Sequence, residues 1–148
     1  MVSMTDDNKN VRDEVLARFA QSLQPCTVSL GSEGVDDYDP VTGKVTMHFE
    51  SSVAHCHSGQ VVQGGFVAGM LDTAMSMAVM AQSGFSLTPA SLELKVSYLK
   101  GTTIGRNTAI GWVVQSGKTV AFVEGELYNA DGLLLAKANS TARLVPAA

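Results

Sequence analysis

A single carboxylate stands in the most apolar part of this 148-residue chain. Asp72 is the only Asp, Glu, Lys or Arg between Glu50 and Glu93. An unpaired carboxylate among apolar side chains costs free energy, so its presence there indicates a functional role. We interpret Asp72 as a catalytic base or nucleophile whose reactivity is tuned by burial. The alternative is a structural carboxylate that pairs with a cation from elsewhere in the fold or caps a local kink.

Two glycines, Gly64 and Gly65, precede Asp72 at the start of the helix that the apolar pattern predicts over residues 63–82. The first N–H groups of a helix have no intrahelical acceptor and lie at the positive end of the helix dipole. Glycines let a ligand approach these groups closely. The pattern is typical of an oxyanion site for a carbonyl group such as that of a thioester. The same glycines would also permit close helix packing.

The spacing of these groups predicts an oligomer. Gly65 and Asp72 are seven residues apart, which puts them on nearly the same helix face but about 10 Å apart along the axis. A reacting carbonyl must lie about 3 Å from both its donor and its nucleophile. Two such helices packed antiparallel about a two-fold axis bring the glycines of one chain to the aspartate of the other. If both groups are catalytic, we expect a dimer with two shared sites.

Periodicity along the chain predicts the elements that position these residues. Apolar residues recur with helical spacing over residues 11–23 and 63–82 and alternate in several other segments. The predicted strands are residues 27–35, 44–50, 91–99, 107–115, 118–128 and 133–144. The expected fold is α+β, an antiparallel sheet of about six strands wrapped around a long central helix. We divide the chain into a flexible tail, residues 1–10, and a single domain, residues 11–148.

Composition argues against several classes of partner. The net charge is −4 without a run of Lys or Arg, so we expect no nucleic acid. Residues 61–81 have the length and apolarity of a membrane span, but Asp72 lies inside it and no Lys or Arg flanks it. We therefore expect no membrane partner. The two cysteines, Cys26 and Cys56, are expected to be reduced thiols, and the polar N-terminus does not resemble a signal peptide, which indicates a cytoplasmic protein.

Two short motifs resemble sites for a metal or a nucleotide but do not complete them. His55, Cys56 and His57 are adjacent in the sequence, too close together to bind one tetrahedral zinc ion. Residues 116–119 read Ser-Gly-Lys-Thr, like the end of a P-loop, but Trp112 occupies the position of the required first glycine. We therefore expect no metal and no resident cofactor.

The helix start and the aspartate resemble the signature of the hotdog-fold acyl-CoA thioesterases of the phenylacetate-degradation (4-hydroxybenzoyl-CoA thioesterase-like) family. That signature has His-Gly-Gly at the helix start and an Asp about two turns later. The resembling segments are Val-Gln-Gly-Gly-Phe at 62–66, Met-Leu-Asp-Thr-Ala at 70–74, and the strands 91–99 and 116–122. The resemblance spans roughly residues 28–145. It implies a hotdog fold and hydrolysis of an acyl-CoA to a free acid and coenzyme A by a homodimer or homotetramer.

The resemblance also implies roles for individual residues. Asp72 would attack the thioester or activate water. The backbone N–H of Gly65, helped by Gly64, would polarise the carbonyl group, and Ser91 would orient water or the carboxylate. Gln63 replaces the usual His and can donate a hydrogen bond but cannot carry a proton.

Candidate substrate contacts surround these residues. His57 stands where the family often has Asn, and Phe66 and Thr73 flank the catalytic positions. The phosphates of coenzyme A favour basic residues at the pocket mouth, and the candidates are Arg106 and Lys118, then Lys100 and Arg143. Two other functions stay open. A non-catalytic acyl-CoA-binding module on the same fold is favoured by Gln63, whereas a hotdog dehydratase or hydratase is disfavoured because the central helix has no His.

Overall fold

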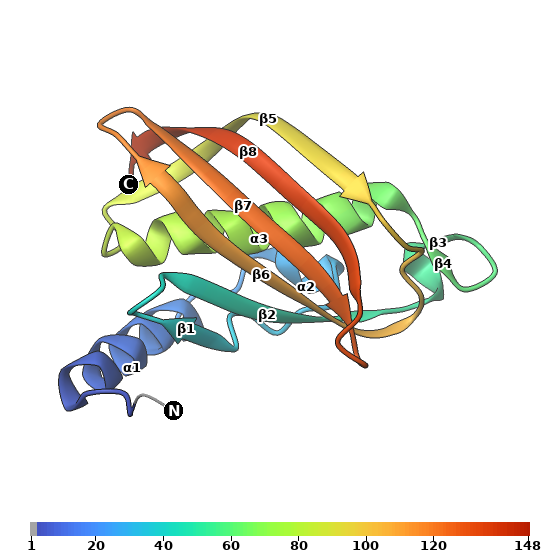
Figure 1. Cartoon of the computed structure of the whole chain (residues 1–148), viewed down its shortest axis with the longest axis horizontal. Coiled ribbons are helices and arrows are strands. Elements are labelled where there is room, and N and C mark those ends of the chain that lie inside the picture. The colour runs from blue at the N-terminus through green and yellow to red at the C-terminus, as the bar shows by residue number, and fades with distance from the viewer. Residues whose placement is uncertain (1–2) are drawn as a thin grey trace.

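The computed structural model describes residues 3–148 as a six-stranded antiparallel sheet across one side of a long helix (Figure 1). The strand order is β1-β2-β6-β7-β8-β5, and β3 and β4 form a separate small hairpin. This confirms the predicted α+β hotdog arrangement. The elements are α1 (Asp6–Ala20), α2 (Pro25–Ser29), β1 (Asp37–Asp39), β2 (Lys44–Ser51), a 3₁₀ turn (Val53–His55), β3 (Cys56–Ser58), β4 (Val61–Val62), α3 (Gly64–Gln82), β5 (Leu87–Tyr98), β6 (Gly105–Ser116), β7 (Val120–Asn129) and β8 (Leu134–Pro146).

One face of the sheet carries the core, because successive side chains of a strand point to opposite faces. In β2, Val45, Met47 and Phe49 are fully buried, and the residues between them face outward. In β7, Ala121, Val123 and Leu127 are buried in the same alternation. The alternation predicted from the sequence therefore sets which face of the sheet meets the helix.

The central helix α3 lies unusually close to the sheet. A Cβ atom built on Gly111 of β6 would lie 2.5 Å from the backbone of Ala74. A Cβ atom on Gly125 of β7 would lie 3.1 Å from Cγ of Met75. These glycines let the backbones of helix and sheet approach each other, which fixes the height and rotation of α3 above the sheet.

Among residues 3–148, α3 is the one helix long and apolar enough to cross a membrane, with a mean hydropathy of 1.3. In this fold, the apolar composition of α3 is explained by its burial under the sheet. Side chains such as Met70, Leu71 and Ala78 are completely buried inside the chain. A helix that is apolar on most sides is expected at the centre of a sheet that wraps it.

The first helix differs from its predicted bounds of residues 11–23. It begins at Asp6, where the side chain of Thr5 accepts a hydrogen bond from the N–H of Asn8 at 3.3 Å. Asp6 and Asp7 occupy the first turn, where negative charge favours the helix dipole. Apolar periodicity starts only at Val11 and therefore missed this polar first turn. Residues 6–10, predicted as part of a flexible tail, are helical, and residues 1–2 of that tail lie outside the described part.

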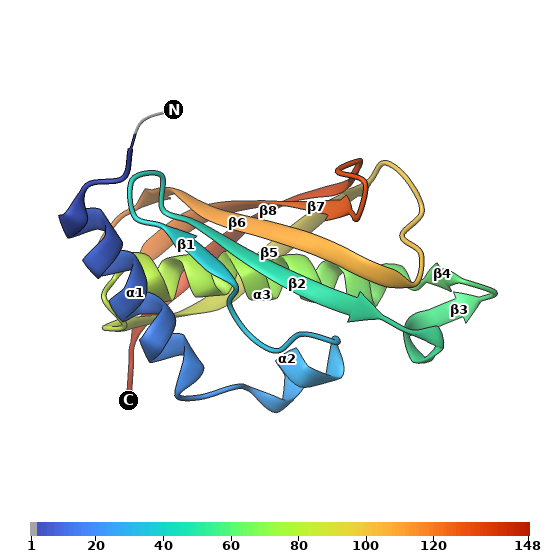
Figure 2. The ribbon, with the colours of Figure 1, turned by 90° about the horizontal axis from the view of Figure 1, so that it is seen from below.

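The predicted strand over residues 27–35 is wrong. Pro25 stands at the first helical position, which its fixed φ favours, and α2 follows instead. Leu30, just after α2, packs against Gly69 of α3, so this segment covers part of the helix rather than joining the sheet. Figure 2 shows α2 on the side of α3 that faces away from the sheet. The edge strand β1 forms later, between the predicted strands 27–35 and 44–50.

Candidate active site

Asp72 lies on the side of α3 that the sheet does not cover. Its neighbours Leu71 and Ala74 point to the sheet and are completely buried, whereas Asp72 is half-buried. The sequence led us to expect a carboxylate tuned by burial, and in the single chain that burial is only partial. With about 3.6 residues per turn, Asp72 is rotated well away from the packed side of the helix. Solvent or another chain can reach the carboxylate.

Ser91 on the edge strand β5 contacts this carboxylate. Its hydroxyl group donates a hydrogen bond of 2.9 Å to Oδ1 of Asp72. The register of β5 against β8 shifts between Ser91 and Glu93, which indicates a bulge at this point. The structure thus brings together the two residues that the sequence placed in one site, although 19 positions separate them.

The start of α3 borders a groove of about 510 Å³. Gln63 occupies the N-cap position, and its side chain makes no capping hydrogen bond in the described chain. The groove is lined by Val62, Gln63, Gly64, Gly65, Val67, Tyr98, Leu99, Lys100, Gly101 and Thr102. Within residues 3–148, the N–H of Gly65 donates to no acceptor, as expected for the first turn of a helix. Gly65 thus places a backbone donor at the wall of a groove large enough for part of a ligand.

Tyr98, at the end of β5, also lines this groove, and no role was assigned to it from the sequence. Its hydroxyl group donates a hydrogen bond of 2.7 Å to the carbonyl oxygen of Gly64. The alternation of β5 places Tyr98 on the same side of the strand as Val96, toward the helix. That alternation was visible in the sequence, but the contact with a glycine 34 residues away was not.

The two ends of the proposed chemistry remain apart within one chain. Gly65 is exposed and Asp72 is half-buried, and both belong to the open side of α3. Seven residues of helix separate them by about 10 Å along the axis. On the open side of α3, one chain therefore has the Gly65 N–H at the helix start and the Asp72 carboxylate two turns further along.

Three predicted substrate contacts have other partners in the single chain. The hydroxyl group of Thr73 donates to the carbonyl oxygen of Gly69 at 2.7 Å, a bond within the helix. Phe66 packs edge to face against the ring of His55, with centroids 5.1 Å apart. His57 is exposed on β3, its Nδ1 is 2.8 Å from Oγ of Ser58, and it does not line the groove.

His55, which the sequence left without a role, is buried and anchors the segment before α3. Its Nδ1 accepts a hydrogen bond of 3.0 Å from the N–H of Ser52, so Nε2 carries the proton toward the carbonyl oxygen of Ser29 at 2.7 Å. Its own carbonyl oxygen accepts the N–H of Gln63 at 2.9 Å. His55 thereby joins the end of α2 to the start of α3, a structural task.

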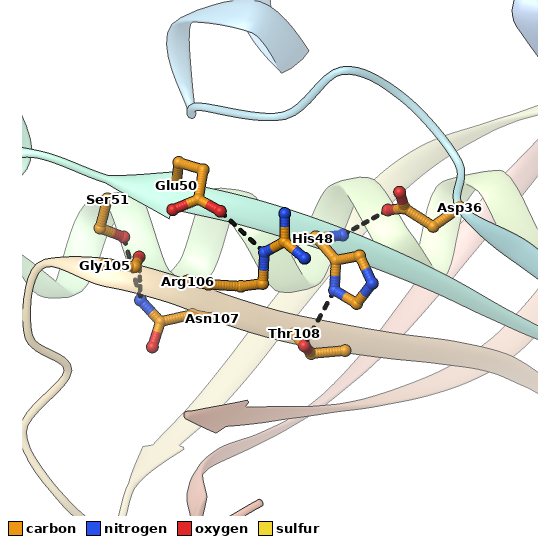
Figure 3. Close-up of polar contacts among 8 residues, drawn as sticks. All are labelled: Asp36, His48, Glu50, Ser51, Gly105, Arg106, Asn107 and Thr108. Carbon is orange, nitrogen blue, oxygen red and sulfur yellow. Dashed lines mark hydrogen bonds and ion pairs between the residues drawn. The ribbon is translucent and has the colours of Figure 1, made fainter. Parts of the chain in front are cut away.

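The predicted basic contacts do not gather at the groove of the same chain. Arg106 lies on the outer face of the sheet, where its Nε contacts Oε1 of Glu50 at 2.7 Å (Figure 3). That hydrogen bond and the adjacent negative charge raise the pKa of the Arg106 guanidinium. Lys118 lies in the turn between β6 and β7, and it too is absent from the groove. Of the basic candidates, Lys100 is the one that lines it.

Comparison with known proteins places this site in a family. Residues 59–136, which contain the helix start, Asp72, Ser91 and Tyr98, match the model of the thioesterase superfamily. The chain belongs to the thioesterase superfamily. The match begins before the glycines and ends in β8, so it includes the whole of α3 and β5. A comparison with curated proteins gives no match.

Solved structures share the fold of this thioesterase-superfamily protein over nearly its whole length. A phenylacetic acid degradation-related protein from Ralstonia eutropha JMP134 is 26% identical, with 87% of this chain and 98% of that one covered and a TM-score of 0.77. The PaaI protein of the E. coli phenylacetic acid degradation operon is 16% identical over 95% and 96%, with a TM-score of 0.78. A hypothetical thioesterase from Streptococcus pneumoniae TIGR4, solved with coenzyme A, is 18% identical over 82% and 93%, with a TM-score of 0.72.

Proposed function

We propose that this protein hydrolyses acyl-CoA thioesters to a free acid and coenzyme A. The observation that carries the proposal is Asp72, a carboxylate on the open side of an apolar helix, held by Ser91 and following a helix start with a free N–H. Membership of the thioesterase superfamily supports the reaction class. The coenzyme A bound in the Streptococcus pneumoniae relative supports the coenzyme as the thiol half of the substrate.

Each group has a defined task in this reaction. The Ser91 hydroxyl group donates to Oδ1 of Asp72, which orients the carboxylate and leaves Oδ2 to attack the thioester carbon or to take a proton from water. The N–H of Gly65, at the positive end of α3, stabilises the negative charge that develops on the carbonyl oxygen. Water supplies the hydroxyl group of the acid, and its proton goes to the departing thiolate.

The proposal includes a second copy of the chain. Because Gly65 and Asp72 of one chain are two helical turns apart, the donor and the carboxylate of one active site come from different chains. The twelve-residue strand β5 supports this arrangement, since it forms a free sheet edge beside Asp72. Its Leu92 is 62% exposed, a liability for an unpaired edge strand. A homodimer, alone or within a homotetramer, would cover this edge.

The same arrangement indicates which basic residues could contact the substrate. Lys100 lines the groove and is the nearest candidate for the phosphates of coenzyme A. Arg106 and Lys118 of the same chain lie elsewhere, so any role for them would be exercised toward the site of a neighbouring chain. Gln63 and His57 are exposed beside the helix start and remain candidates for contacts with the acyl group.

Thiol release from a panel of short, medium, long and aryl acyl-CoAs tests the reaction. We expect turnover on part of the panel and a loss of about 1,000-fold in kcat for Asp72→Asn, because the amide neither attacks nor accepts a proton. Asp131→Asn, the same change at an exposed turn residue, is the matched control and should keep full activity. Full activity of Asp72→Asn would exclude the assigned mechanism.

A binding module is the second candidate, because Gln63 replaces a residue able to carry a proton and makes no capping bond in the described chain. Calorimetric titration with coenzyme A and with acyl-CoAs separates the two candidates. Tight binding of acyl-CoA by a folded oligomer that turns over no member of the panel would establish the module. Turnover that depends on Asp72 would exclude it.

Subunit mixing tests the shared site. We would co-express Asp72→Asn and Gly65→Val chains with different tags and purify the mixed oligomer. Each variant alone should be nearly inactive, since valine at position 65 blocks the approach to the N–H. If the sites are shared, the mixed dimer contains one intact site with Gly65 and Asp72 from different chains, and activity returns to about half of the wild-type value. If each chain holds its own site, mixing restores nothing.

A further inference from the structure

Tyr98 packs directly on the first residue of α3. Its hydroxyl group donates to the carbonyl oxygen of Gly64 at 2.7 Å, and the residue is 54% exposed at the rim of the groove. A Cβ atom on Gly64 would lie 3.0 Å from both Cζ and the hydroxyl oxygen of Tyr98. The ring therefore sits against the helix start at a distance that favours glycine at position 64.

The bonded carbonyl group has a specific partner within the backbone. The C=O of Gly64 and the N–H of Gly65 belong to the same planar peptide unit, so they cannot rotate independently. A hydrogen bond accepted by the C=O fixes the plane of this unit. It also polarises the unit, which makes the N–H at its other end a stronger donor.

Apart from the hydrogen bond that the Gly64 carbonyl oxygen accepts within the α-helix itself, the helix start has little to hold this peptide unit. Two consecutive glycines have wide conformational freedom, and the N-cap residue Gln63 provides no side-chain capping bond within the described residues. First-turn N–H groups also lack intrahelical acceptors. The Tyr98 hydroxyl group is the side-chain hydrogen bond that the described chain supplies to the Gly64–Gly65 unit.

We propose that Tyr98 is a positioning residue that sets the direction and donor strength of the Gly65 N–H through its hydrogen bond to the Gly64 carbonyl oxygen. This inference rests on the proposed thioesterase function, since the N–H is the donor to the thioester oxygen. Tyr98 acts through the peptide unit and exchanges no proton with the substrate. The short strand-to-helix contact thus extends the active site to the end of β5.

The test compares Tyr98→Phe with Tyr128→Phe in the full-length oligomer. Both changes delete a phenolic hydroxyl group that donates a hydrogen bond, but Tyr128 donates to Glu126 on the outer face of the sheet. We expect Tyr98→Phe to lower kcat about tenfold, less than the hundredfold or more typical of deleting an oxyanion donor outright. The Kd for coenzyme A should change less than about twofold in both variants, and Tyr128→Phe should keep the wild-type kcat.

A spectroscopic readout separates this role from simple packing. With ¹⁵N-glycine labelling, the Gly65 amide signal, assigned by its loss in Gly65→Ala, should shift in Tyr98→Phe, because its peptide unit loses the hydrogen bond at the carbonyl end. The signal of Gly125, buried against Met75, should stay in place. This measurement does not depend on turnover.

The outcomes distinguish the inference from the function on which it rests. A lower kcat with unchanged coenzyme A binding and a shifted Gly65 signal supports the positioning role. An active wild-type enzyme with an equally active Tyr98→Phe variant overturns the inference and leaves the function intact. A raised KM with unchanged kcat also overturns it, because Tyr98 would then be a substrate contact. A wild-type protein without turnover overturns the function and the inference together.

Discussion

The two sides of α3 differ in how closely other parts of the chain pack against them. On the side that faces the sheet, a carbon atom added to Gly111 would collide with the backbone of Ala74, and one added to Gly125 would crowd the side chain of Met75. On the open side, the nearest described atom to a Cβ added on Gly65, outside its own stretch of helix backbone, lies 3.8 Å away, and Asp72 is half-buried beside an exposed strand. One helix of 19 residues thus serves as a packed core element and as the wall of a site.

This difference has a physical advantage for the proposed chemistry. A catalytic group works only if its position is fixed within a fraction of an ångström, and side chains on rigid elements are held better than those on loops. The packed side provides that rigidity without any polar group. The open side can then carry a carboxylate and a free N–H without the cost of burying them in the core.

The largest expected effect is on stability, and it comes from a change on the packed side of α3. Gly111→Ala places a Cβ atom 2.5 Å from the backbone of Ala74, so the helix must move or the strand must bend. Overpacking of this kind costs about 3 kcal/mol of the free energy of unfolding. Urea unfolding would measure it, with Gly117→Ala as the control, because the nearest atom there lies at an ordinary 3.5 Å. Equal midpoints for the two variants would contradict the tight packing.

Ser91→Ala tests the open side through activity. The change removes the donor to Oδ1 of Asp72, and we expect kcat to fall about tenfold because the carboxylate is less well oriented. The free energy of unfolding should stay within about 0.5 kcal/mol, since the hydroxyl group is exposed. Ser97→Ala, on the outer side of the same strand, is the control. A Ser91→Ala variant that loses stability instead of activity would show that the open side is structural.

Gly64→Ala tests the same side at its other end. The added methyl group would push the Tyr98 ring away from 3.0 Å contact, and we expect kcat to fall about fivefold as the hydrogen bond lengthens. If this loss acts through the Tyr98 hydroxyl group, the double variant with Tyr98→Phe should be no slower than the slower single variant. Independent, multiplying losses would show that Gly64 acts by another route.

The smallest effect concerns the outer face of the sheet, which carries neither the core nor the site. The hydrogen bond from Tyr128 to the Glu126 carboxylate raises the pKa of Tyr128 to about 12, against an ordinary value near 10. Because the folded-state pKa is raised, its stabilising contribution is complete below about pH 10 and is lost as the pH rises toward 12. In Tyr128→Phe, the free energy of unfolding, measured by urea unfolding at several pH values, should depend less on pH over that range. The same slope in both proteins would contradict the assignment.

Much of the fold could be read from local sequence patterns. Alternation predicted β2, β6, β7 and β8 nearly to their ends, and the apolar run predicted α3 to within one residue of its start at Gly64. Periodicity works in these segments because each has one buried side that meets the same core throughout. It failed for residues 27–35, where α2 and the chain after it cover a helix instead of joining a sheet.

The sequence by itself determined which residues are suited to the chemistry, since one carboxylate in an apolar helix and two glycines at its start stand out by type alone. Only the tertiary structure decided which of them have partners. It paired Asp72 with Ser91 across 19 positions and Gly64 with Tyr98 across 34. It also placed Arg106 with Glu50, away from the groove. Such contacts depend on strand order and helix rotation, which arise from packing between distant segments and leave no periodic signal in the chain.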